Sequence, residues 1–133
     1  MEIFALKKRK YFVEAARGYK VVTNGIVLQA AFCSPKQNPT ENCCFAGFTA
    51  TKKLGKAHIR NRVKRRLRAV ARLVLNKYGV KNVNYVFIGR HNTADLDFEY
   101  LHRKAINAIE EINNLLSGVG ETQNDKADND CND

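Results

Sequence analysis

The sequence has no long hydrophobic run. No apolar stretch approaches the ~18–20 residues that a membrane-spanning helix needs, which argues against a helical membrane protein. The first residues, MEIFALKKRKYF, also lack the apolar centre of a secretory signal peptide. We therefore expect a cytoplasmic protein with no membrane partner.

The sequence has four cysteines, and they are not spaced as zinc ligands usually are. They are Cys33, Cys43, Cys44 and Cys131. There is no Cys-x-x-Cys pair, and the adjacent Cys43 and Cys44 are poorly placed to share one ion. Thiols in the cytoplasm normally stay reduced. The sequence thus predicts no structural metal, and it predicts Cys33 and Cys44 as small buried side chains in strands.

A set of catalytic residues is missing as well. The three histidines stand apart from any cluster of carboxylates: His58, His91 and His102. Three acids, Asp95, Asp97 and Glu99, fit the favourable negative start of a helix better than a metal site. No glycine-rich phosphate loop and no nucleophile elbow occurs. We therefore predict no catalytic residue in the protein, and the chain reads as a binding module.

Acidic residues are absent from residues 52–72, where ten Lys or Arg occur. The whole chain has a net charge of +10, so everything outside this segment sums to zero. Like charges at i,i+4 destabilise a helix, and exposed faces usually mix both signs. A polyanionic partner, most simply a nucleic acid, is therefore predicted. An anionic membrane is the weaker interpretation, because the apolar residues here suit a packed core.

The same segment, residues 51–78, carries apolar residues at helical spacing. They are Ile59, Val63, Leu67, Val70, Val74 and Tyr78. Most of the polar and cationic residues fall on the opposite side of the helical wheel: Arg60, Asn61, Lys64, Arg65, Arg68 and Arg72. Arg62 and Arg66 fall near the boundary. We predict one helix, about 30 Å long, with one face in the core and the other in solvent.

The remaining elements follow from turn signals and alternation. A short helix follows the basic residues 7–10 and ends at Gly18 in a left-handed conformation. Strands are predicted at residues 19–23, 25–32, 43–51 and 83–88. The face of the third strand that carries Phe48 is assigned to the core. A last helix runs from an Asp97 cap through Leu116.

This order predicts a small α+β sandwich, α-β-β-β-α-β-α, with helices packed on one mixed sheet. The strands at 43–51 and 83–88 are joined by a β-α-β crossover, so they should be parallel. Residues 1–116 form a single nucleic-acid-binding domain in this interpretation. Residues 117–133 contain five acids and one lysine, and we expect them to be a disordered tail.

Residues 47–72, GFTATKKLGKAHIRNRVKRRLRAVAR, resemble the protein subunit of bacterial ribonuclease P. The marks are a strand running into Lys52-Lys53, a glycine turn at Gly55, and Arg60-Asn61-Arg62 opening a basic helix. The resemblance covers roughly residues 7–116. It implies a fold related to a ribosomal-protein domain with a left-handed crossover, where the general rule for β-α-β units expects a right-handed one.

The resemblance also implies a function. Such a subunit binds a catalytic RNA, one protein per RNA, and promotes removal of the 5′ leader from precursor tRNA. The chemistry is a Mg²⁺-assisted hydrolysis carried out by the RNA. The positions carried over as RNA-binding are Lys52, Lys53, Lys56, Arg60, Asn61, Arg62, Lys64, Arg65 and Arg68. A cleft for the leader would use Tyr11, Phe12 and Thr49.

Two alternatives remain open on charge alone. A non-enzymatic RNA-binding or ribosome-associated protein would use the basic segment equally well. A helix that binds duplex DNA would also do so, and the 2′-hydroxyl is what allows a protein to distinguish RNA from DNA.

Overall fold

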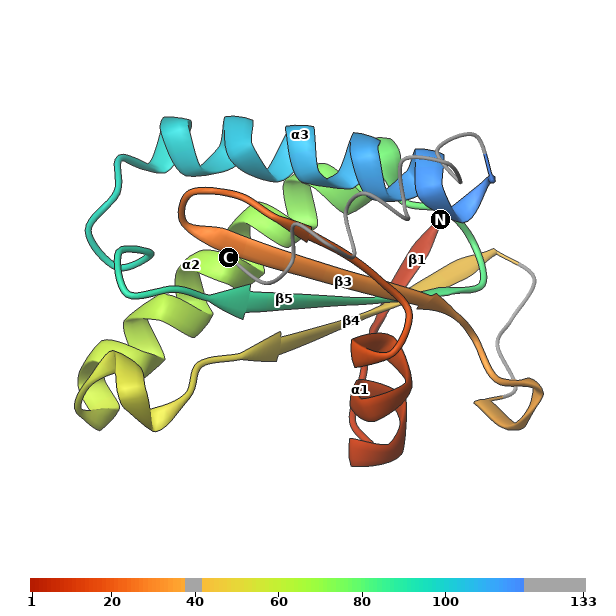
Figure 1. Ribbon diagram of the computed structural model, residues 1–133, viewed down its shortest axis with the longest axis horizontal. Coiled ribbons are helices and arrows are strands. Elements are labelled where there is room, and N and C mark those ends of the chain that lie inside the picture. The colour runs from red at the N-terminus through yellow and green to blue at the C-terminus, as the bar shows by residue number, and fades with distance from the viewer. Residues whose placement is uncertain (38–41, 119–133) are drawn as a thin grey trace.

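Five strands form one mixed sheet in the computed structural model, which describes residues 1–37 and 42–118 (Figure 1). The strands are β1 (Glu2–Ala5), β2 (Tyr19–Val22), β3 (Ile26–Phe32), β4 (Cys43–Thr49) and β5 (Val83–Gly89). The helices are α1 (Arg9–Ala16), α2 (Ala57–Tyr78) and α3 (Phe98–Leu116), with 3-10 turns η1 (Pro35–Gln37) and η2 (Lys52–Leu54). The acidic tail lies outside the described residues from position 119 onwards.

The strand order in the sheet is β1-β4-β5-β3-β2. β4 and β5 are parallel across the α2 crossover, which confirms that prediction. β3 pairs antiparallel with both β2 and β5. The chain therefore has the predicted α+β architecture with a mixed sheet.

The strand β1 is not predicted by the sequence patterns. It pairs in parallel with the first half of β4, from Glu2 opposite Cys43 to Ala5 opposite Ala46. Backbone hydrogen bonds from Glu2 N to Asn42 O, 3.0 Å, and from Leu6 N to Ala46 O, 2.9 Å, continue the ladder at its two ends. Four residues are too few to show alternation, which is why the sequence did not predict this strand. Its backbone is ordered by pairing with β4.

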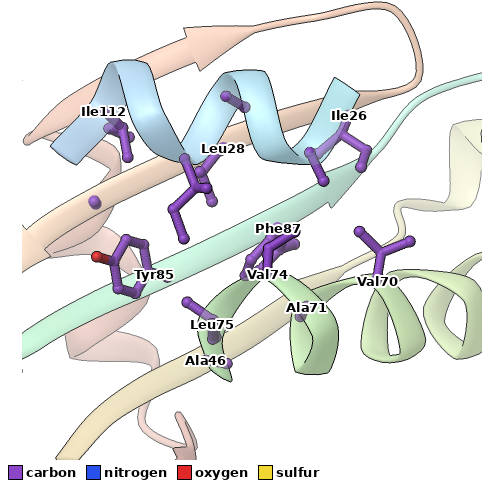
Figure 2. Packing of buried hydrophobic residues seen from close by; sticks show 14 of the residues in the cluster. Ile26, Leu28, Ala46, Val70, Ala71, Val74, Leu75, Tyr85, Phe87 and Ile112 are labelled. Carbon is purple, nitrogen blue, oxygen red and sulfur yellow. The ribbon is translucent and has the colours of Figure 1, made fainter. Parts of the chain in front are cut away.

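The main core lies between the sheet and the helices α2 and α3. Figure 2 shows side chains of β3 and β5, such as Leu28 and Phe87, packed with Val74 of α2. The predicted helix stripe of Val63, Leu67, Val70 and Val74 is buried. The helix α3 buries a stripe of its own, which includes Leu101, Ala105, Ile109 and Ile112. Ile59 and Tyr78, at the two ends of the stripe, are half-buried and pack against this core.

The two faces of β4 separate as predicted. Cys44 and Ala46 are buried in the main core, and Phe48 packs at its border. The opposite face contributes Phe45 to a second, smaller cluster under α1. The helix α1 therefore covers the face of the sheet opposite α2 and α3.

One local prediction is wrong. Gly18 does not end α1 in a left-handed conformation; glycine is needed there because a Cβ would lie 2.3 Å from Ala30 O of β3. The basic helix begins at Ala57, after η2 and Gly55, at φ +133°, have turned the chain, as the glycine turn predicted. The Asp97 cap is also confirmed, since its carboxylate accepts a hydrogen bond from Tyr100 N at 3.4 Å.

The buried thiol of Cys44 makes the stability of the fold depend on pH. Burial raises the pKa of Cys44 to about 11 from an ordinary value of 9.0. Between these two values the unfolded chain has released the proton while the folded chain retains it, so stability falls as the pH rises. We expect Cys44→Ala to flatten this fall when urea unfolding is compared at pH 8 and about pH 10.5. An identical slope in wild type and variant would contradict the prediction.

Candidate nucleic-acid interface

The helix α2 presents a continuous polar and cationic surface away from the core. Its exposed members are Asn61, Arg62, Arg65, Arg68 and Arg72, and Arg60 and Lys64 are half-buried beside them. The 22 residues of α2 contain no acid. Lys52, Lys53 and Lys56 are exposed just before its first turn, so they extend the same surface.

The start of α2 concentrates positive potential. The cap position, Lys56, makes no side-chain hydrogen bond to the helix, and the first turn has no acidic residue. The first backbone N–H groups of a helix have no intrahelical partner and carry partial positive charge. Lysines and arginines beside these groups destabilise the isolated helix, whereas phosphate oxygens would stabilise it.

Three arginines of α2 also fix the neighbouring loops. Arg60 Nε donates to Gly55 O at 3.2 Å, which holds the turn before the helix. Arg62 Nε and Arg66 Nη1 both donate to Ala94 O, at 3.0 and 2.9 Å, and Arg66 Nη2 donates to Leu96 O. Arg60 and Arg62 therefore orient their guanidinium groups through protein contacts, and their remaining N–H groups are available to a ligand.

The loop between β5 and α3 is tied to the β2–β3 hairpin. Thr93 is fully buried; its Oγ1 donates to Gly25 O at 2.6 Å and accepts from Arg90 N at 2.7 Å. Arg90 Nη1 donates to Thr23 O at 3.0 Å. Sequence reasoning missed this network because its partners lie more than 60 residues apart. Together with the bonds from Arg62 and Arg66 to Ala94 O, this network ties the hairpin and the loop to the first half of α2.

Arg66 is expected to act on stability rather than on ligand binding. Arg66→Met removes the donor to Leu96 O, while Ala94 O keeps its bond from Arg62. The carbonyl of Leu96 is partly buried, and losing its donor should cost about 1 kcal/mol, which urea unfolding should detect. Arg65→Met, on the exposed side of the same helix, should change stability by less than about 0.5 kcal/mol. Equal effects of the two variants would contradict this assignment.

The residues predicted to bind the leader lie on the α1 face of the sheet, and they differ in how far they are exposed. Tyr11 is only 7% exposed and belongs to the cluster under α1. Phe12 is half-buried and lies directly over Gly47, where a Cβ would come within 2.5 Å of its ring. Thr49, two residues along β4, shares the face of Gly47 and is half-buried. Phe12 thus offers more surface to a ligand than Tyr11.

Within residues 1–37 and 42–118, no three His, Cys, Asp or Glu side chains come close enough to share a metal ion. In the same part of the chain, none of the helices is both long and apolar enough to cross a membrane.

Comparison with known proteins gives consistent matches. A family model described as Ribonuclease P matches residues 4–113. The ribonuclease P protein component of Gluconacetobacter diazotrophicus is 42% identical over 97 residues, which span 72% of this chain and 79% of the relative. That of Ruegeria pomeroyi is 42% identical over 101 residues, spanning 74% and 78%.

The solved structures support the fold. The RNase P protein of Staphylococcus aureus matches with a TM-score of 0.64 at 20% identity, over 82% of this chain and 94% of that one. The RNase P protein of Thermotoga maritima matches with a TM-score of 0.63 at 22% identity, over 77% and 92%. The predicted α+β fold is therefore confirmed by both the strand order and these neighbours.

Proposed function

The chain belongs to the ribonuclease P protein family, and on this premise we propose that it binds the catalytic RNA of ribonuclease P and promotes removal of the 5′ leader from precursor tRNA. The observation that supports this most strongly is α2, which has one face in the core and an acid-free cationic face in solvent. The protein then contributes binding and positioning, and the RNA carries out the hydrolysis.

In this proposal the catalytic RNA docks on α2 and the turn before it. The docking residues are Lys52, Lys53, Lys56, Arg60, Asn61, Arg62, Lys64, Arg65 and Arg68. Arginine can grip a phosphate with two parallel N–H groups, whereas lysine supplies a mobile point charge. Asn61 is exposed and uncharged, so its contribution is a shaped hydrogen bond.

The single-stranded leader lies on the other face of the sheet, beside α1. Phe12 supplies a ring for an unstacked base, and the edge of Tyr11 and the hydroxyl of Thr49 flank it. The basic residues 7–10 lie at the start of the same helix and attract the leader's phosphates. In this proposal one protein binds one RNA through these two surfaces, and the complex acts in the cytoplasm.

The Mg²⁺ that assists the hydrolysis is assigned to the RNA. The described residues contain no cluster of metal-binding side chains, so no step of this proposal uses a protein-bound ion. The role of the protein is to reduce the amount of Mg²⁺ that the RNA needs, because its cations offset part of the phosphate repulsion.

The test is a cleavage assay with a bacterial ribonuclease P RNA and a precursor tRNA at low Mg²⁺. We expect the full chain to increase leader removal well above the rate of the RNA alone. If the protein binds the RNA but gives no increase, the proposal is wrong and the chain is a non-enzymatic RNA-binding protein. Mature tRNA provides the control for contacts that do not involve the leader.

A further inference from the structure

A groove of about 400 Å³ separates β1 from α2. Its floor is formed by Ala46 and Phe48 of β4. One wall carries the cations Lys64, Arg68 and Arg72, and Ala5 of β1 contributes to the other. None of the described residues that line it is acidic. Phe12 and Gly47, from the α1 face of the sheet, also line it, so the groove runs around the open edge of the sheet from the cationic surface of α2 to Phe12.

The floor of the groove is an open strand edge. β1 pairs with β4 only as far as Ala46, whereas β5 pairs with β4 as far as Thr49 on the other side. In a parallel ladder, every second residue directs both its N–H and its C=O to the same neighbour. The carbonyls of Asn42 and Ala46 face β1, so the N–H and C=O of Phe48 face the groove.

A flat aromatic and cationic pair lies beside these backbone groups. The guanidinium of Arg68 is 5.8 Å from the centre of the Phe48 ring. That ring is held from behind, because it stacks on Phe87 with centroids 5.8 Å apart and planes 25° apart. Aromatic rings and guanidinium planes are the surfaces on which proteins stack unpaired RNA bases.

We propose that this groove holds one unstacked base of the partner RNA. The base stacks on the Arg68 guanidinium beside the edge of the Phe48 ring. Its polar edge pairs with the N–H and C=O of Phe48, and the phosphates that flank its nucleotide contact Lys64 and Arg72. The charge of the groove favours this occupant over a peptide strand, since each ionisable side chain among the described lining residues is cationic. The inference rests on the proposed function only in requiring an RNA on the α2 side.

The test compares two conservative variants in the complex of the full chain with a bacterial ribonuclease P RNA. Arg68→Lys keeps the charge but loses the planar group, and Phe48→Leu keeps an apolar floor but loses the ring. Base reactivity toward dimethyl sulfate is measured with and without protein. We expect wild type to protect a few unpaired bases, and both variants to restore reactivity at one of them while leaving the rest of the footprint intact. The affinity of each variant should fall about tenfold at an unchanged salt slope.

A matched control is available on α3, where the guanidinium of Arg103 also lies 5.8 Å from an aromatic centre, that of Tyr100. Arg103→Lys should leave the footprint and the affinity unchanged. If the footprint of Arg68→Lys equals that of wild type at every base, the inference is overturned and a peptide strand becomes the better occupant. Arg68 is exposed, so this variant tests the groove even if Phe48→Leu folds poorly. A complete absence of protection by wild type would instead overturn the proposed function.

Discussion

Replacing Arg60 and Arg65 together with alanine is expected to weaken binding to ribonuclease P RNA about a hundredfold, because hydrogen bonds to charged groups contribute roughly 1.5–3 kcal/mol each. Both residues lie on the acid-free surface of α2, and Arg65 is exposed. Each phosphate contact that is lost should also reduce the slope of log K against log salt by roughly 0.7–0.9. Filter binding over a range of salt concentrations measures both effects.

The control for this experiment is a double variant on α3 that changes the net charge by the same amount. Arg103 and Lys104 lie on α3, where their charged groups contact the ring of Tyr100. Replacing both with alanine should leave the slope almost unchanged. A reduction equal to that of the α2 pair would show that overall charge, and not this surface, determines binding. Because Arg60 also holds Gly55 O, unfolding curves must show that the α2 double variant is folded.

The second large effect is expected for the leader. Phe12→Leu keeps an apolar side chain over Gly47 but removes the aromatic ring. Stacking of one base on an aromatic side chain contributes about 1–3 kcal/mol, so the affinity of the holoenzyme for precursor tRNA should fall roughly tenfold. Mature tRNA lacks the leader, and its affinity should not change.

Tyr11→Phe is the matched variant for this site. It removes only a hydroxyl from a ring that is 7% exposed, so we expect little change for either substrate. An equal loss of affinity for precursor and mature tRNA in Phe12→Leu would place Phe12 in a structural role. A loss of affinity for precursor tRNA in Tyr11→Phe but not in Phe12→Leu would show that Tyr11, and not Phe12, contacts the leader.

The helices and the central strands could be predicted because the spacing of their apolar residues matches the side that is buried. The spacing of Val63, Leu67 and Val74 requires a helix with one buried face, and the structure confirms it. The alternation around Phe48 likewise identified the core side of β4. In contrast, β1 is too short for a pattern, and the need for glycine at residue 18 arises from a backbone atom of Ala30, which no local pattern can reveal.

For the site, the positive surface could be predicted from charge alone, since no acid interrupts residues 52–72. The contacts of Arg62 and Arg66 with Ala94 O could not, because the residues are about 30 positions apart and join only in the fold. The difference between Tyr11 and Phe12 was hidden for a similar reason. Adjacent helix residues point about 100° apart, and only the packing of α1 decides which one is buried.

The positions of α1 and α2 on opposite faces of one sheet have a consequence for substrate geometry. A leader beside α1 and an RNA on α2 would be held on opposite faces of one sheet, and the two sides would meet only at the groove that Phe12 and Arg68 both line. The protein would then act as a spacer of fixed thickness. We expect cleavage to tolerate changes in the leader's nucleotide sequence, but to respond sharply when an inserted nucleotide alters the distance from the scissile bond to Phe12.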